Sequence, residues 1–309
     1  MIFTVTLNPA LDKEYIVPQI VFDDVMRMKN LQIDFGGKGF NVSRMLTSLG
    51  EENTALGFVG GHTGEVIKAG LEALGISTDL SLIKDETRTN ISIVDQDDCH
   101  YVKLNEAGPQ VSPSETSAFL EKMDKLVQEG DFWVVSGSLP RGIPVDIYAQ
   151  MIKKINQAQG HAIFDSSGLP LQMGVNEKPY LIKPNLYELS TLMGLEISEV
   201  SELPDIVKRL HEEGIRLVLV SMGEDGAFLS DSKACYVGQS PKINEKNPIG
   251  AGDAMVAGMT WRLALGDAPP VALQWAMACG TAAASLPGTK MPTMNQVKEF
   301  FELINIKEL

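Results

Sequence analysis

The residues best suited to chemistry are 247–253, reading Asn-Pro-Ile-Gly-Ala-Gly-Asp at the start of an apolar run over 254–265. The run predicts a helix, and the first backbone N–H groups of a helix have no partner within it. We expect the N–H groups of Gly250, Ala251 and Gly252 to face an anion there, which the helix dipole also favours. Asp253 would stand beside that anion as a candidate base. The pattern predicts a phosphoryl-transfer site, although the dipole alone also favours an acid in a first turn.

A second glycine-rich stretch, residues 36–39, precedes the helix predicted over 41–49. It lacks the spacing of a mononucleotide P-loop, and Phe40 occupies the place of the required Ser or Thr. Gly37 could instead let the backbone approach a sugar, with Lys38 and Asn41 reaching its polar groups. A simple glycine-rich turn is the alternative interpretation.

An amide and a carboxylate stand three residues apart at Asn185 and Glu188. On a helix they share a face, where they could organise a hydrated Mg²⁺ near phosphates. The alternative is a helix cap made by the Asn with an acid in the first turn.

Other polar residues are candidates for binding a substrate. Asp12 follows Asn-Pro and is either a turn residue or a ligand for sugar hydroxyls. Arg88, and with it Arg27, could bind a substrate phosphate, although an exposed surface arginine is the default interpretation. Ser138 could bond the substrate or serve only the turn at 136–140.

The segments that must position these residues alternate between strands and helices from about residue 112 onwards. This rhythm predicts a doubly wound, mainly parallel sheet with helices on both faces, in which ligands bind at the carboxyl ends of the strands. Earlier, the segments 11–35 and 87–105 contain paired strands without helices between them. We therefore expect one domain, 1–309, with a small β appendage that is discontinuous in sequence.

Composition narrows the class of protein. The 309 residues are 44% hydrophobic and 21% charged, which is ordinary for a globular protein. With 26 basic and 40 acidic residues the net charge is −14, which argues against nucleic acid or an anionic membrane as the main partner. The three cysteines are far apart, the four histidines lack metal-ligand spacing, and the N-terminus lacks a signal-peptide pattern. We expect a cytoplasmic protein with reduced thiols and no membrane span.

Together these motifs resemble the ribokinase-like (PfkB) family of carbohydrate kinases over essentially the whole chain. The carriers of the resemblance are 247–253, 36–41 (Gly-Gly-Lys-Gly-Phe-Asn) and 183–188 with its Asn-x-x-Glu. Residues 6–12, 87–90, 136–140 and 164–167 are similar to the 1-phosphofructokinase and tagatose-6-phosphate kinase subgroup. The resemblance implies a Rossmann-like three-layer α/β/α core with a β-sheet lid that also forms a homodimer contact in relatives.

The resemblance also implies roles for the candidate residues. Asp253 would be the base, and Gly250, Ala251 and Gly252 the anion hole. The sugar phosphate would be held by Asp12, Arg27, Gly37, Lys38, Asn41, Arg88 and Ser138. ATP would lie along Lys183, Ser221, Gly223 and Gly226, and Asn185 and Glu188 would influence Mg²⁺ mainly through water.

Three alternatives are weaker on the residues present. A kinase for an unphosphorylated sugar or nucleoside would not need the cations Arg88 and Lys38. A nicotinamide-dependent oxidoreductase would carry Gly-x-Gly-x-x-Gly after the first strand, where this chain has Asn8-Pro9. A non-catalytic sugar-phosphate sensor would not need Asp253. The motif at 87–90 favours fructose 1-phosphate over tagatose 6-phosphate as the substrate.

Overall fold

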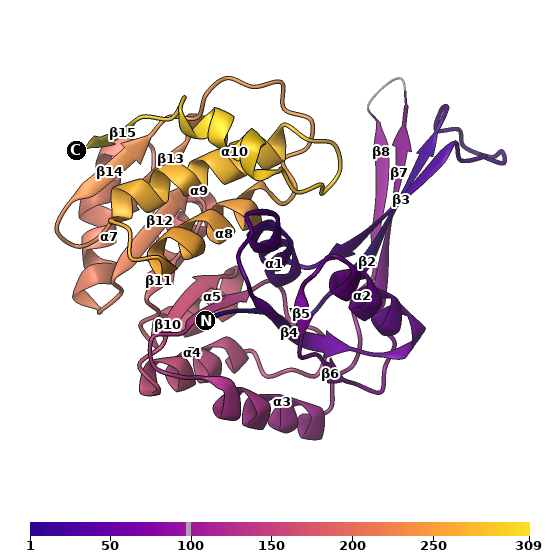
Figure 1. Ribbon diagram of the computed structural model, residues 1–309, viewed down its shortest axis with the longest axis horizontal. Helices are drawn as coiled ribbons and strands as arrows, with labels where there is room; N and C mark the ends of the chain where they lie inside the picture. The colour runs from indigo at the N-terminus through magenta and orange to yellow at the C-terminus, as the bar shows by residue number, and fades with distance from the viewer. Residues whose placement is uncertain (97–99) are drawn as a thin grey trace.

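The computed structural model describes residues 1–96 and 100–309, drawn in Figure 1. The strands of its large sheet are β1 (Ile2–Thr6), β4 (Thr54–Val59), β5 (Ser77–Thr78), β6 (Ser81–Leu82), β9 (Phe132–Ser136), β10 (His161–Asp165), β11 (Leu181–Ile182), β12 (Leu217–Ser221), β13 (Ala227–Ser230), β14 (Cys235–Gly238) and β15 (Ile306–Glu308). Within the described residues this sheet has eleven strands, in the order β15-β14-β13-β12-β11-β10-β9-β1-β4-β5, with β6 also paired to β4. The strands from β5 to β12 along this order pair in parallel, and β13 to β15 add an antiparallel edge.

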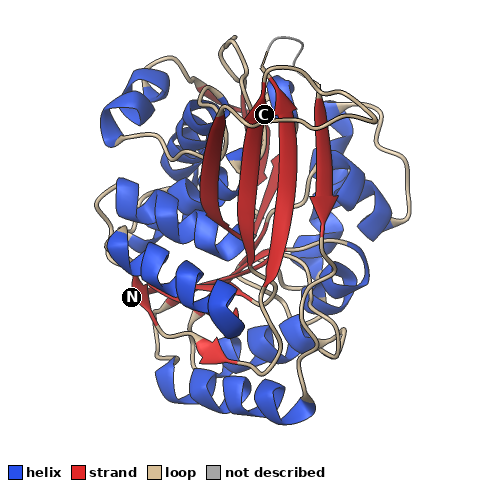
Figure 2. Ribbon diagram, turned by 90° about the vertical axis from the view of Figure 1, so that its right-hand side faces the viewer, coloured by secondary structure: helices blue, strands red, loops and turns tan. Residues whose placement is uncertain are grey.

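Helices pack on both faces of the large sheet, which lies behind the four long strands that face the viewer in Figure 2. They are α1 (Lys38–Ser48), α2 (Gly61–Ala73), α3 (Pro113–Leu126), α4 (Ile147–Gln157), α5 (Gly168–Val175), α6 (Leu186–Met193), α7 (Leu203–Glu212), α8 (Ala251–Ala264), α9 (Pro269–Ala284) and α10 (Met294–Phe301), with short 3₁₀ turns η1 (Val200–Glu202) and η2 (Gly223–Asp225). One hydrophobic core joins the sheet to α3–α7, and a second joins its other face to α1 and α8–α10. The predicted three-layer α/β/α fold is confirmed.

The two cores follow from the alternation of side chains along each strand. In β9, Trp133 and Val135 enter the first core, whereas Val134 enters the second. Trp133 also stacks on Phe3 of the neighbouring strand β1, with ring centroids 4.3 Å apart. Because both faces are covered, the central strands read as continuous apolar runs, and polar residues collect where the strands end.

A separate four-stranded sheet, called the small sheet below, projects from this body (Figure 1). It has the order β3-β2-β7-β8 and is built from β2 (Ala10–Val17), β3 (Asn30–Gly36), β7 (Arg88–Asp95) and β8 (Tyr101–Asn105). β2 and β7 pair in parallel, so that Asp12 lies opposite Asn90. This pairing brings residues far apart in sequence to one place beside the large sheet.

Several boundaries differ from those predicted, mainly in the small sheet. The predicted segment 11–35 contains β2 and β3, but β3 begins only at Asn30, because its partner β2 ends at Val17 and is followed by Pro18, which cannot donate to a ladder. The helix α5 was not predicted, since its sequence contains two glycines and a proline. The edge strand β15 was also missed. Residues 97–99 of the predicted segment 87–105, which include one of the three cysteines, Cys99, lie outside the described residues.

No helix in residues 1–96 or 100–309 has both the length and the apolar character needed to span a bilayer. Of the cysteines in those ranges, Cys235 and Cys279 are both free thiols.

Candidate active site

Asp253 lies in the first turn of α8, and its side chain is buried. Its Oδ2 accepts a hydrogen bond of 2.8 Å from the Nδ2 of Asn41, which lies in the first turn of α1. Two segments 212 residues apart in the chain therefore meet at one carboxylate. Both helices begin beside the carboxyl ends of the parallel strands, where an open α/β sheet binds its ligands.

The surroundings of Asp253 prepare it to take up a proton. Burial raises the pKa of this carboxyl to about 6, against the opposing effect of the Lys38 ammonium. The neighbouring carboxylate of Asp165 raises the pKa further, whereas the Asn41 hydrogen bond and the charge of Lys183 lower it. A base with a pKa close to neutrality is ionised at pH 7 yet holds a proton well enough to assist transfer.

Asp165 forms ion pairs with two lysines, Lys38 and Lys183, near the Asp253 carboxylate. It ends β10 and is buried, and its Oδ1 accepts a hydrogen bond of 3.0 Å from Lys38 Nζ. Lys183 Nζ lies 3.5 Å from its Oδ2. Desolvation would raise the pKa of Asp165, but the two lysines outweigh it and hold the pKa below its ordinary value. The carboxylates of Asp165 and Asp253 outweigh desolvation at Lys38 and raise the pKa of its ammonium, so Lys38 is cationic.

The N-terminus of α8, residues Gly250 to Gly252, lies beside Lys183 and is called the rim below. Gly250 is the N-cap residue in a left-handed conformation, with φ 85°, which favours glycine. Lys183 reaches this rim, since a Cβ built on Gly252 would lie 3.5 Å from its Nζ. The N–H of Ala251 donates to the carbonyl oxygen of Pro248 at 3.2 Å. One of the three predicted anion-hole donors is thus engaged within the loop itself.

A cavity of about 740 Å³ opens beside the N-terminus of α8. Its walls come from the turn after β12, the loop 240–248 and the helices α8 and α9. Of the predicted nucleotide and metal residues, Ser221, Gly223, Gly226 and Asn185 line it, as do Ala251 and Gly252. Lys183 is not part of its lining and lies beneath the rim instead. The cavity and the Asp253 carboxylate therefore adjoin the same helix terminus, although Asp253 itself does not line the cavity.

Asn185 and Glu188 form a reciprocal helix cap at the start of α6. The Asn185 Oδ1 accepts from the Glu188 N–H at 2.8 Å, and the Glu188 Oε2 accepts from the Asn185 N–H at 2.9 Å. This capping arrangement is the alternative interpretation of their spacing. It leaves the second carboxylate oxygen of Glu188 to act outside the cap, and the charge of Glu188 acts on Lys38.

The base of the small sheet holds a second group of predicted residues. Asn90 Nδ2 donates to Asp12 Oδ1 at 2.7 Å, and burial raises the pKa of Asp12. The Arg88 guanidinium donates to the carbonyl oxygens of Asn8, Pro9 and Glu106 at 3.0 to 3.3 Å. An arginine has five N–H donors, so two of them remain beyond these three bonds. Arg88 thus supports the turn between β1 and β2 and still has donors to spare.

The remaining predicted sugar ligands are less closely joined. Gly37 caps α1 with φ 126°, and a Cβ there would overlap the side chain of Thr6, so a glycine is required. Ser138 Oγ accepts from Asn8 Nδ2 at 3.3 Å. Arg27 lies exposed in the loop between β2 and β3, and no described contact joins it to the other site residues.

Asp165, Asn90 and Arg44 make contacts at the site, although no role was predicted for them. Asp165 had a recognisable signal, an acid that ends an apolar strand at the ligand-binding edge. Its partner Lys38 is 127 residues away, so the pairing itself depends on the fold. Arg44 reads in sequence as an exposed helical residue, yet only 9% of its side chain is exposed.

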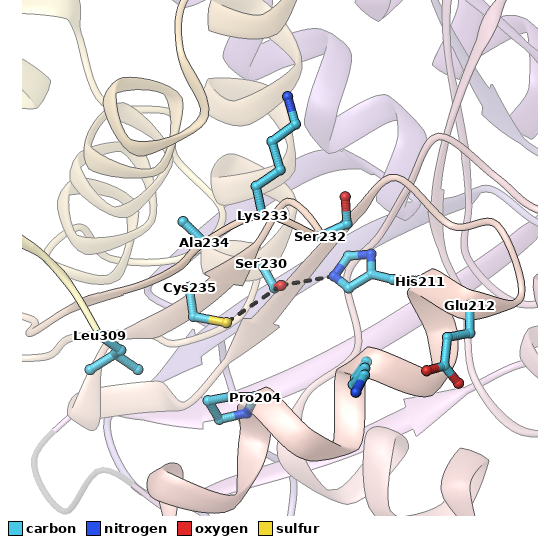
Figure 3. Close-up of a pocket in the computed structure, with 10 residues that line it drawn as sticks. Pro204, His211, Glu212, Ser230, Ser232, Lys233, Ala234, Cys235 and Leu309 are labelled. Atoms are coloured by element: carbon cyan, nitrogen blue, oxygen red, sulfur yellow. Dashed lines mark hydrogen bonds between the residues drawn. The ribbon is translucent and has the colours of Figure 1, made fainter.

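A second cavity of about 640 Å³ lies between α7 and the hairpin of β13 and β14 (Figure 3). None of the predicted site residues lines it. His211 contacts the carbonyl oxygen of Ile215 through Nδ1 and the Ser230 Oγ through Nε2, both at 2.8 Å. A carbonyl oxygen can only accept, so Nδ1 donates to Ile215, and the Ser230 hydroxyl can either donate or accept at Nε2. With both nitrogens satisfied, His211 joins α7 to β13.

Comparison with known proteins agrees with this geometry. Residues 6–295 match the family described as pfkB family carbohydrate kinase. The chain is 39% identical over 258 residues to a 1-phosphofructokinase of Bacillus subtilis (strain 168), covering 84% of each chain. Among solved structures, phosphofructokinase-2 of Escherichia coli in complex with potassium superposes with a TM-score of 0.93 at 29% identity, covering 98% of both chains. Its tetrameric inhibited form superposes with a TM-score of 0.91 and the same identity and coverage. A buried carboxylate at a glycine-rich helix terminus, on this fold and with these relatives, shows that the chain belongs to the pfkB family of carbohydrate kinases.

Proposed function

We propose that the protein transfers the γ-phosphoryl group of ATP to fructose 1-phosphate, yielding fructose 1,6-bisphosphate and ADP. The observation that carries the proposal is the position of Asp253. It is a buried carboxylate with a raised pKa in the first turn of α8, whose residues Ala251 and Gly252 line the cavity, and it accepts a hydrogen bond from Asn41 of α1. The 39% identical relative named 1-phosphofructokinase supports this choice of sugar phosphate.

In the proposed reaction, the sugar hydroxyl gives its proton to Asp253 and its oxygen forms a bond to the γ-phosphorus. The bond from that phosphorus to the β,γ-bridging oxygen breaks, and ADP leaves with the electron pair. Lys183 and the N–H groups of Gly250 and Gly252 meet the charge on the transferring group. Catalysis of this kind depends on positioning and charge stabilisation more than on covalent work by the protein.

The cavity lined by Ser221, Gly223 and Gly226 is the proposed nucleotide site. Asn185, which lines the cavity, and Glu188, which keeps one carboxylate oxygen outside the helix cap, are the residues that would hold a hydrated Mg²⁺ beside it. Magnesium keeps most of its waters, so one or two such oxygens suffice beside the phosphates. When bound, the ion would neutralise charge on the phosphates of ATP.

A coupled assay of ADP release with ATP and Mg²⁺ tests the proposed substrate. We expect the highest kcat/KM with fructose 1-phosphate, compared with tagatose 6-phosphate, fructose 6-phosphate and fructose. Preference for tagatose 6-phosphate would replace the sugar phosphate named here while leaving the kinase chemistry intact. Turnover of fructose, and of no phosphorylated sugar, would contradict the proposed role of Arg88 in holding a phosphate.

Arg88→Ala should raise KM for the sugar phosphate roughly tenfold or more and leave KM for ATP within about twofold. The reason is that a charge-assisted hydrogen bond to phosphate is worth about 1.5–3 kcal/mol, and 1.4 kcal/mol is a factor of ten. Steady-state kinetics with each substrate varied in turn measure the two effects. Arg216→Ala is the matched control, because Arg216 lies over the ring of Tyr180 just before β12, at the end of the strand opposite to the proposed site. An equal rise in both KM values would remove Arg88 from the phosphate site.

The small sheet is proposed to act as a lid over the sugar and as a homodimer contact. All five residues of the edge strand β8 are exposed, among them Tyr101 and Leu104. Phe22, in the loop between β2 and β3, is 83% exposed. An exposed apolar edge of this kind favours association with another chain. Light scattering after gel filtration should give twice the monomer mass, and a monomer at micromolar concentration would contradict the proposal.

A further inference from the structure

Arg44 projects from α1 into a nearly closed space between the small sheet and the loop that follows α9. Its Nη2 donates to Asp34 Oδ1 and to the Thr289 carbonyl oxygen, both at 3.0 Å. Its Nη1 donates to Asn41 Oδ1 at 3.3 Å and to Thr289 Oγ1 at 3.4 Å. The guanidinium is therefore held on three segments at once, and Figure 1 shows α1 between the small sheet and α8.

The contact with Arg44 determines which way the Asn41 amide faces. A guanidinium can only donate, so the atom of Asn41 that it contacts must be the oxygen. The amide nitrogen is then turned to Asp253, whose ionised carboxylate can only accept. A flipped amide would set oxygen against carboxylate and N–H against guanidinium, which are two repulsive contacts in a buried place.

The same group of residues reaches the loop before the anion hole. The carbonyl oxygen of Gly288, next to Thr289, accepts from Asn247 Nδ2 at 2.9 Å. Asn247 Oδ1 in turn accepts from the N–H of Ile249 at 3.0 Å. The loop after α9 thus contacts Arg44 on one side and the segment that precedes Gly250 on the other.

We propose that Arg44 is a positioning residue for phosphoryl transfer. Through Asn41 it fixes the N–H group that faces Asp253, and through Asp34 and Thr289 it ties that group to β3 and to the loop after α9. The proposal rests on the proposed function, in which Asp253 is the base.

The direction of the pH effect follows from the groups around Asp253. The charged side chains facing it are Lys38 from α1, Asp165 from the end of β10 and Lys183 from the segment after β11. The Asn41 hydrogen bond lowers the pKa of Asp253. Without Arg44 the Asn41 amide loses its fixed orientation, so the pKa of Asp253 should rise. As the pH is lowered, Asp253 should then become protonated, and kcat should fall, at a higher pH than in the wild type.

The test is Arg44→Met, measured as kcat against pH from 5 to 9. We expect kcat at pH 7 to fall roughly tenfold, while KM for ATP changes little. The acid limb of the pH–rate profile, where kcat falls as the base becomes protonated, should move to higher pH by about one unit. Arg262→Met is the matched control, because Arg262 also forms an ion pair, with Asp267, and lies over the ring of Trp261 in the last turn of α8. It should leave the acid limb in place. If Arg44→Met fails to fold, the Asp34→Asn/Arg44→Met double variant, which leaves no unpaired carboxylate, takes its place.

A double-mutant cycle with Asn41→Leu separates action through the amide from direct action of the charge. If Arg44 acts through Asn41, Arg44→Met adds little further shift of the acid limb once the amide is gone. A full shift in the Asn41→Leu background would overturn the proposal. Asp253→Asn separates the proposed function from the proposed role of Arg44. Wild-type turnover by Asp253→Asn would contradict the proposed function, whereas its inactivity together with a wild-type profile for Arg44→Met would contradict the role of Arg44 alone.

Discussion

Asp253→Asn is expected to lower kcat by roughly 10²–10⁴-fold, the usual contribution of a positioned general base. The substitution keeps the shape of the side chain but removes its ability to take the proton of the attacking hydroxyl. Affinity for ATP should stay within about threefold, because Asp253 does not line the cavity that Ser221 and Gly223 form. Single-turnover kinetics and calorimetric titration with ATP measure the two quantities.

The pH dependence provides a second reading of the same variant. The wild-type rate should fall as the pH drops below about 6, because burial raises the pKa of Asp253 to about 6 and only the ionised form accepts a proton. Asp253→Asn should lack this limb. Near-normal turnover, or an unchanged limb, would remove Asp253 from the role of base.

Stability serves as the control for Asp253→Asn. Folding raises the pKa of Asp253, so at pH 7 the ionised carboxylate destabilises the folded state relative to the unfolded state. Asparagine removes this charge, and the melting temperature of the variant at pH 7 should therefore be no lower than that of the wild type. Asp131→Asn is the matched variant, since Asp131 is a buried carboxylate outside the site and forms an ion pair with the N-terminus. It should lose stability and keep its kcat within about twofold.

The predictable part of the site consists of residues whose type and local sequence carry the signal. Gly250 and Asp253 are recognisable because a glycine-rich turn before an apolar helix has one physical use that stands out, the binding of an anion. Lys38 and Asn41 carry a weaker signal, because a glycine-rich stretch before a helix suits either the approach of a sugar or a simple turn. The three-layer fold was predictable because strand and helix periods alternate along most of the chain.

What could not be predicted are the partnerships across the fold. The small sheet pairs Asp12 with Asn90, and its register depends on β2 lying parallel to a strand that begins 78 residues later. Arg44 contacts Thr289 across 245 residues. Helical spacing predicts which face such a residue occupies, but the packing of α1 against the small sheet and the loop after α9 decides what it meets.

Asp165→Asn should reduce the free energy of unfolding by about 3–5 kcal/mol at pH 7, which is the usual cost of breaking a buried ion pair. The variant would leave Lys38 and Lys183 facing a neutral amide, and Lys183 is almost fully buried. The two lysines hold the pKa of Asp165 below its ordinary value, so its ionised form stabilises the fold above the unfolded pKa, near 3.8. The difference between variant and wild type should therefore narrow as the pH falls below about 4. Urea unfolding at several pH values measures it.

The same variant should move the acid limb of kcat to lower pH, opposite to the direction expected for Arg44→Met. The negative charge of Asp165 raises the pKa of Asp253, and its removal also leaves both lysines free to lower that pKa. Asp79→Asn is the matched control, because Asp79 pairs with Lys122 at 2.7 Å where the two side chains are 41% and 27% exposed. An exposed pair is worth about 0–1 kcal/mol, so this variant should lose little stability and keep its limb. If kcat of Asp165→Asn falls while the acid limb of its pH–rate profile stays in place, the charge of Asp165 does not act on the pKa of Asp253. Asp165 would then serve only to hold Lys38 and Lys183.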